Sequence, residues 1–151
     1  MKLTQRNNNI ATVESYTKEM SRFLKRASED CPFCAANHAD EVDSFRSVIA
    51  LEDKNPVTQG HLLIIPRRHT QDFFTMSAEE KDDAVQLIGA LQNKVINADP
   101  TVLGFNIGIN CGEAAGQTVA HAHIHLIPRR CGDTQNPRGG VRGVIPEKMT
   151  Y

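Results

Sequence analysis

The chain has 151 residues, of which 40% are hydrophobic and 23% charged, as is typical of a soluble globular protein of about one domain. Its 17 basic and 18 acidic residues give a formal net charge of -1, and 5% of its residues are aromatic. These values argue against a strongly cationic nucleic-acid-binding protein, a membrane-surface peptide and a broad platform for base stacking.

Apolar segments along the chain are short. The run at residues 61–65 falls far below the ~20 apolar residues that a membrane span needs. Residues 1–30 contain no apolar core like that of a signal peptide. We therefore expect a cytoplasmic protein that contacts neither a membrane nor a nucleic acid.

Residues 1–30 are mostly polar, but apolar side chains recur among them at helical spacing. This pattern predicts an N-terminal helical extension ahead of one domain at residues 31–151. Within that domain, residues 44–51 are rich in strand-forming side chains, and residues 61–65 form an apolar run that ends at Pro66. Both segments are predicted to be strands.

A capping box at residues 77–80 marks the start of a predicted helix that continues to about Ala98. Further strands are predicted over residues 104–110 and 119–127. The tail at residues 132–151 is rich in Gly, Pro and Arg, and no long regular element is expected there. Strands joined by short loops, with one long helix between them, predict an α+β fold with a mostly antiparallel sheet of about five strands.

Three histidines alternate with apolar residues in His121-Ala122-His123-Ile124-His125. On a strand, the three imidazoles would share one face of the sheet. They would span about 13 Å, whereas a metal ion binds imidazole nitrogens at about 2.0–2.1 Å. A single ion can therefore take one or two of them, and at least one remains. That histidine could be a nucleophile or a general base, or belong to a hydrogen-bonded cluster without chemistry.

A glycine-rich loop directly precedes the histidines. It contains Gly112 and Gly116, which allow close backbone approach, and the uncharged polar residues Asn110, Gln117 and Thr118. Such a loop suits an anionic phosphoryl group, which a neutral imidazole could attack. A simple turn is the alternative interpretation.

Cys31 and Cys34 form a CxxC motif, which is typical of half of a tetrahedral zinc site or of a redox pair. A zinc site needs two further ligands. A thioredoxin-like redox pair would need a βαβ context that the surrounding sequence lacks. A pair of free thiols without metal is the third possibility.

These patterns together resemble the histidine triad (HIT) family of nucleotide hydrolases and transferases. The resemblance covers about residues 31–130, and the tail at residues 137–142 is similar to a bacterial branch labelled as diadenosine tetraphosphate hydrolases. The matching segments are His121-Ala122-His123-Ile124-His125-Leu126-Ile127, Asn110-x-Gly112, Gly116-Gln117-Thr118-Val119 and Asp53-x-x-Pro56 with Gly60-His61-x-Leu63-x-Ile65-Pro66-x-x-His69.

The resemblance implies a HIT-like fold and a homodimer whose sheet continues across the interface. It also implies cleavage of adenine nucleotides at the α-phosphate through a covalent nucleotidyl-histidine intermediate, without a catalytic metal. Dinucleoside polyphosphates such as diadenosine tetraphosphate, or nucleoside phosphoramidates, would be the substrates. The alternatives are a phosphorolytic nucleotidylyltransferase and a non-catalytic zinc- or nucleotide-binding module.

Roles for individual residues follow from the same resemblance. His123 would attack the α-phosphorus, His125 would contact the phosphate or the leaving group, and His61 would support the triad that His121 begins. The predicted substrate ligands are Asn110, Gln117 and Thr118 for phosphate oxygens and the leaving group, with Gln117 also counted as catalytic, and Asp53 for the ribose hydroxyls. A solvated turn is the alternative for Asp53.

The zinc-carrying branch of the family implies a ligand set for the CxxC motif. Cys31 and Cys34 would be joined by His69 and by His121, the first residue of the triad. The zinc would be structural.

Overall fold

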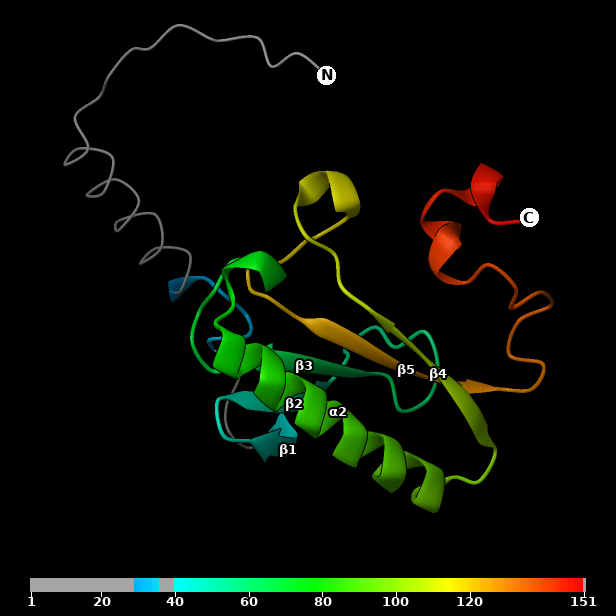
Figure 1. The fold of residues 1–151 in the computed structure, drawn as a ribbon, viewed down its shortest axis with the longest axis horizontal. Coiled ribbons are helices and arrows are strands. Elements are labelled where there is room, and N and C mark those ends of the chain that lie inside the picture. The colour runs from blue at the N-terminus through cyan, green and yellow to red at the C-terminus, as the bar shows by residue number, and fades with distance from the viewer. Residues whose placement is uncertain (1–28, 36–39, 151) are drawn as a thin grey trace, which may run out of the picture.

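The computed structural model describes residues 29–35 and 40–150, so nearly all of the predicted N-terminal helix at residues 1–30 lies outside the described residues. The described part forms a five-stranded antiparallel sheet of order β1-β2-β3-β5-β4, with the long helix α2 across one face (Figure 1). The strands are β1 (Glu41–Phe45), β2 (Val48–Glu52), β3 (Leu62–Pro66), β4 (Val102–Gly108) and β5 (Ile124–Arg130). The predicted α+β class, with one long helix, is confirmed.

The predicted capping box starts helix α2 (Ala78–Ala98). The Ser77 hydroxyl accepts the Glu80 backbone N–H at 3.1 Å, and the Glu80 carboxylate accepts the Ser77 N–H at 2.8 Å. These bonds satisfy two amides that a helix end leaves unpaired, and two negative charges in the first turn suit its positive end. Short 3-10 helices complete the described elements: η2 (Phe73–Thr75), η3 (Glu113–Ala115), η4 (Val141–Val144) and η5 (Pro146–Lys148).

The central strands β2 and β3 are buried on both faces, and alternation divides their side chains between two apolar clusters. One cluster lies under α2 and joins Val48, Ala50, Leu62 and Ile64 to the helix residues Ala84, Leu87 and Leu91. The other, on the opposite face, contains Ile49, Leu51, Leu63 and Ile65, with Phe33 packed against it. His125 on β5 pairs with Leu63 on β3, so the last triad histidine lies on the face away from α2.

The strand predicted over residues 44–51 is wrong as one element, because a turn at Arg46 and Ser47 divides it into β1 and β2. Arg46 has a φ of 47°, and no glycine, proline or asparagine marks the turn in the sequence. The turn is instead held by a side chain that lies far away in the sequence. The buried Asp83 carboxylate on α2 accepts the Ser47 backbone N–H at 3.2 Å and the Ser47 hydroxyl at 2.7 Å.

The strand predicted over residues 119–127 begins later, at Ile124, so His121 and His123 precede the sheet ladder. The Ala122 N–H donates to the Thr70 carbonyl at 2.7 Å in place of a ladder bond. Alternation nevertheless continues through this segment, because Ala122 lies with Ile124 in the cluster under α2. No helix within residues 29–35 and 40–150 is long and apolar enough to cross a membrane.

We expect Asp83→Ala to lower the free energy of unfolding by about 1–3 kcal/mol, because it leaves the two Ser47 donors without their acceptor. Denaturant unfolding measures the change, with Asp82→Ala as the matched control, since Asp82 is exposed on the same helix. Equal stability of the two variants would contradict the role given to Asp83.

Candidate active site and metal centre

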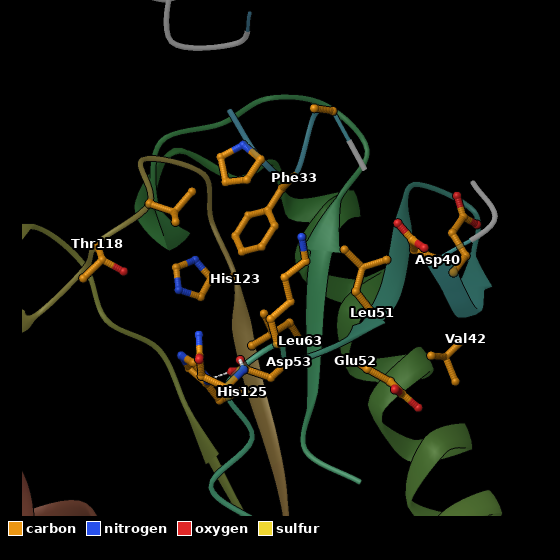
Figure 2. A pocket seen from close by; sticks show the side chains of 16 residues that line it. Phe33, Asp40, Val42, Leu51, Glu52, Asp53, Leu63, Thr118, His123 and His125 are labelled. Carbon is orange, nitrogen blue, oxygen red and sulfur yellow. Dashed lines mark hydrogen bonds and ion pairs between the residues drawn. The ribbon is translucent and has the colours of Figure 1, made fainter. Parts of the chain in front are cut away.

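A cleft of about 1420 Å³ opens on the face of the sheet away from α2 (Figure 2). Its walls come from the turn after Cys31, from β1, from the end of β2 and from the segment around the histidines. His123 and His125 point into it, and Asp53 and Thr118 also line it. The structure therefore brings four of the predicted site residues to one cavity. Lys54 is the one lysine or arginine among the described residues that line it.

His123 is held in one tautomer by the backbone carbonyl of His121. Its Nδ1 lies 2.7 Å from the carbonyl oxygen of His121. A carbonyl can only accept, so Nδ1 carries the proton and Nε2 keeps its lone pair. The side chain is buried, with 8% of its surface exposed, and lines the cleft. In the neutral form of the ring, this arrangement directs the lone pair of Nε2 away from the His121 carbonyl and orients it for nucleophilic attack.

His125 is held in the opposite tautomer by a chain of hydrogen bonds. The Val57 N–H donates to Nδ1 of His61 at 3.3 Å, so the His61 proton is on Nε2. That N–H donates to Nδ1 of His125 at 3.0 Å, which leaves the His125 proton on Nε2. Burial lowers the pKa of both rings, which favours their neutral forms. His125 can therefore donate to an oxygen in the cleft.

The carboxylate of Asp53 lies 3.5 Å from Nε2 of His61 and 3.9 Å from Nδ1 of His125. Donor atoms of these three residues lie within 4.8 Å of one another, a spacing that a metal ion could use. However, a neutral imidazole has a single lone pair, and in His61 the Val57 N–H already uses it. The geometry favours a hydrogen-bonded cluster here over a metal site.

Asp53 combines the two roles that the sequence left open. Its Oδ1 accepts the Asn55 N–H at 2.8 Å, as in a local turn, while the side chain also lines the cleft. It directly follows β2, which places it at the mouth of the cleft beside the histidine pair.

The predicted phosphate ligands differ in their positions. Thr118 lines the cleft. Gln117 fixes the glycine-rich loop: its Oε1 accepts the Gly112 N–H at 2.7 Å, and its Nε2 donates to the carbonyls of Gln71 and Val119. The Asn110 side chain packs against Gly116, whose φ of 83° requires glycine. In this structure Gln117 therefore holds the loop in shape, and neither Gln117 nor Asn110 is among the described residues that line the cleft.

The four predicted zinc ligands converge beside the cleft, with their donor atoms within 4.8 Å of one another. Sγ of Cys34 lies 3.2 Å from Nδ1 of His69 and 3.5 Å from Nδ1 of His121, and Sγ of Cys31 lies 3.5 Å from the latter atom. Around a tetrahedral zinc ion, with bonds of about 2.0–2.3 Å, ligand atoms are roughly 3.3–3.8 Å apart. The two-sulfur, two-nitrogen set therefore fits zinc.

His121 is also oriented as a metal ligand. Its Nε2 lies 2.8 Å from the Pro66 carbonyl oxygen and must donate to it, so Nδ1 presents its lone pair to the cysteines. Burial and the neighbouring Cys31 raise the pKa of Cys34 to about 11 in the absence of metal. Zinc binding must therefore displace a proton from this thiol.

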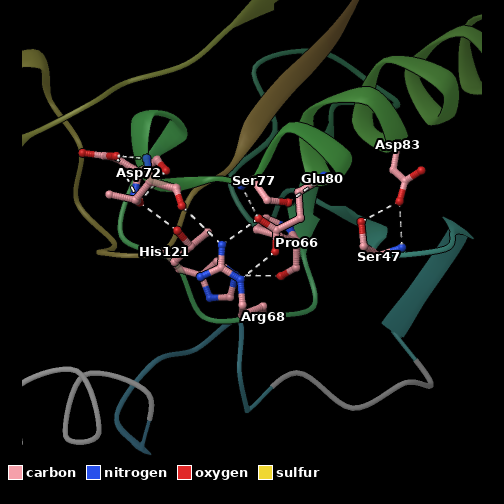
Figure 3. Close-up of polar contacts among 10 residues, drawn as sticks. Ser47, Pro66, Arg68, Asp72, Ser77, Glu80, Asp83 and His121 are labelled. Carbon is pink, nitrogen blue, oxygen red and sulfur yellow. Dashed lines mark hydrogen bonds and ion pairs between the residues drawn. The ribbon is translucent and has the colours of Figure 1, made fainter. Parts of the chain in front are cut away.

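Sequence reasoning missed the residues that position His69. Figure 3 shows the Glu80 carboxylate, which caps α2, also accepting two hydrogen bonds of 2.8 Å from Arg68. This pair lowers the pKa of the Glu80 carboxyl and fixes the residue next to His69 against the start of the helix. The capping box can be predicted from the sequence, but no local sequence pattern indicates that Arg68 pairs with Glu80.

Phe33 was also missed as a site residue. It lies inside the CxxC motif, lines the cleft, and contacts the rings of His121 and His123 edge-on. The only available signal was the apolar residue between the two cysteines.

Known proteins resemble the chain in sequence and in fold. The family model described as HIT domain matches residues 36–132. An uncharacterized HIT-like protein of Mycobacterium tuberculosis is 37% identical over 115 residues, which cover 74% of this chain and 79% of that protein. A bis(5'-adenosyl)-triphosphatase of Dictyostelium discoideum is 37% identical over 90 residues, or 58% of each chain.

A solved structure resembles the chain as well. The crystal structure of a zinc-bound histidine triad family protein from Mycobacterium smegmatis is 33% identical, with a TM-score of 0.52. The match covers 76% of this chain and 78% of the other.

Proposed function

The chain belongs to the HIT family, and we propose that it hydrolyses dinucleoside polyphosphates at the α-phosphorus through a nucleotidyl intermediate on His123. The observation that carries the proposal is the tautomer of His123, whose Nδ1–H is bound to the His121 carbonyl and whose Nε2 lone pair is available in the cleft. The similarity to a bis(5'-adenosyl)-triphosphatase supports an adenine dinucleotide as substrate.

In the first step, Nε2 of His123 attacks the α-phosphorus, a P–N bond forms, and the P–O bond to the leaving nucleotide breaks. The leaving oxygen carries away the electron pair. Nε2–H of His125, set by the hydrogen-bond chain from Val57 and His61, donates to a phosphate oxygen and stabilises the developing charge.

In the second step, water adds to the phosphorus and the P–N bond breaks. The electron pair returns to Nε2 of His123, a proton passes to solvent, and nucleoside monophosphate leaves. Thr118 at the cleft is proposed to bind phosphate, and Asp53 the ribose hydroxyls, because a carboxylate accepts from paired hydroxyl donors. Asn110 and Gln117 are proposed to support this binding by holding the glycine-rich loop in shape.

We also propose that Cys31, Cys34, His69 and His121 hold a structural zinc ion, which would tie the CxxC turn to the segments that follow β3 and precede β5. The zinc-bound mycobacterial relative supports this assignment.

A homodimer is proposed through β4. This strand is at one end of the sheet, and Leu103 and Ile107 on it are 76% and 49% exposed. An edge strand with exposed apolar side chains is suited to pairing with a second copy, which would continue the sheet. The domain is proposed to span residues 31–151, with residues 1–30 as a separate extension.

A turnover panel tests the activity. We expect kcat/KM for diadenosine tri- or tetraphosphate to exceed that for adenosine phosphoramidate, with AMP among the products. A higher kcat/KM for the phosphoramidate would overturn the substrate assignment. Nucleoside diphosphate that forms only with added phosphate would indicate a phosphorolytic nucleotidylyltransferase. Nucleotide binding without turnover of any of these compounds would indicate a binding module.

A further inference from the structure

One aromatic ring connects the metal centre to the catalytic cleft. The ring of Phe33 lies edge-on to that of His121, with 5.8 Å between centroids and 83° between planes. It lies in the same way against His123, at 5.3 Å and 62°. Figure 2 shows Phe33 directly beside His123 in the wall of the cleft. A single side chain therefore contacts a zinc ligand and the proposed nucleophile.

The position of Phe33 depends on the turn that carries it. This turn lies outside the sheet and contains a backbone hydrogen bond of its own, from Ala35 N–H to the Cys31 carbonyl at 3.0 Å. Among the described residues, the hydrogen bonds between this turn and the rest of the domain are all made by the thiols of Cys31 and Cys34. Phe33 adds apolar packing against the cluster around Leu51 and Leu63. Fixing the thiols therefore fixes the ring.

We propose that metal binding and nucleotide binding are thermodynamically coupled through Phe33, an inference that rests on the proposed function. Zinc at the four ligands fixes the turn, and the turn holds the Phe33 ring in the cleft wall and against His123. Without zinc, a nucleotide must order the turn as it binds, and this loss of conformational entropy weakens its affinity.

Coupling of this kind is reciprocal. If zinc tightens nucleotide binding by some factor, nucleotide tightens zinc binding by the same factor. Couplings between two sites are typically about 5–150-fold, and we expect about tenfold here, because one ring and one short turn carry the link. Phe33→Ala removes the ring while leaving all four metal ligands in place, so it should reduce the factor to about threefold or less. The remaining coupling would pass through the His121 carbonyl, which accepts the Nδ1–H of His123.

AMP and zinc are the probes. Calorimetry gives the Kd of AMP for zinc-loaded and metal-depleted protein, and chelator competition gives the Kd of zinc with and without saturating AMP. Circular dichroism establishes whether the depleted protein stays folded. If it does not, all affinities are measured at a lower temperature and with a stabilising osmolyte, under conditions in which circular dichroism shows the depleted protein to be folded. Phe74→Ala is the matched control, because Phe74 is 77% exposed and lies outside the cleft lining.

The expected result is about tenfold tighter binding in both directions for wild type and Phe74→Ala, and about threefold or less for Phe33→Ala. AMP binding that is equal with and without zinc in wild type would overturn the coupling and leave the proposed function standing. Coupling that stays near tenfold in Phe33→Ala would overturn the role given to the ring. A zinc-loaded wild type that fails to bind AMP would overturn the proposed function and this inference together.

Discussion

Replacing His123 with alanine is expected to lower kcat for AMP release by roughly 10⁴-fold or more, the scale of loss found when a covalent nucleophile is removed. The other residues of the cleft can bind and orient the substrate, but none of them presents an unprotonated nitrogen in the position of His123 Nε2. Because the interaction is made in the transition state, kcat should fall while the Kd of AMP changes little.

Rapid-quench measurement of AMP release tests this expectation. An alkaline quench, followed by mass spectrometry, should also detect a nucleotidyl adduct on the peptide that contains His123, since a P–N bond is labile in acid. The adduct should be absent from the variant. Thermal unfolding controls for damage to the fold, because the ring is buried against Phe33 and His125. Turnover within tenfold of wild type would exclude His123 as the nucleophile.

Elements with local signals could be predicted from the sequence. Helix α2 begins and ends where its capping box and its last apolar turn place it, because those signals lie within the helix or next to it. β3 was found to within one residue, since a short run of large aliphatic side chains ends at Pro66. The four predicted metal ligands lie close together in the structure, as the resemblance to a family pattern implies, although they are spread from Cys31 to His121.

Features that depend on distant contacts could not be predicted. The turn at Ser47 is held by Asp83, which is 36 residues away. The triad was expected on one strand, yet His121 and His123 precede β5, because the backbone there bonds to Thr70 instead of to a neighbouring strand.

The tautomers of the triad histidines could not be predicted from the sequence either. Residue identity indicated that one histidine could attack a phosphorus atom, but it could not assign the proton on any ring. The His121 carbonyl sets the proton of His123, and the Val57 amide sets that of His125 through His61. Both are backbone groups, so the residue types do not indicate these hydrogen bonds. The chemistry of the site therefore depends on loop conformation as much as on the motif.

Cys31→Ala is expected to abolish stoichiometric zinc binding and to lower the free energy of unfolding by more than about 3 kcal/mol. Wild-type protein should carry close to one zinc ion per chain. A zinc ion bound at Cys31 and Cys34, at His69 and at His121 would join three segments that are far apart in the sequence, so its binding energy would contribute directly to folding. Cys31 is buried, and its loss removes a ligand without exposing a charged group.

Elemental analysis and denaturant unfolding at a fixed free zinc concentration measure the two effects. Cys131→Ala is the matched control, because Cys131 is an exposed thiol after β5 and belongs to neither the metal site nor the cleft lining. It should keep its zinc and its stability.

If metal-depleted wild type unfolds at the same denaturant concentration as the zinc-loaded protein, the ion contributes nothing to the fold. In that case the hydrogen bonds between the cysteine and histidine side chains suffice to hold the turn. We expect the opposite, because thiol–imidazole hydrogen bonds are weak and offer little in place of four metal–ligand bonds.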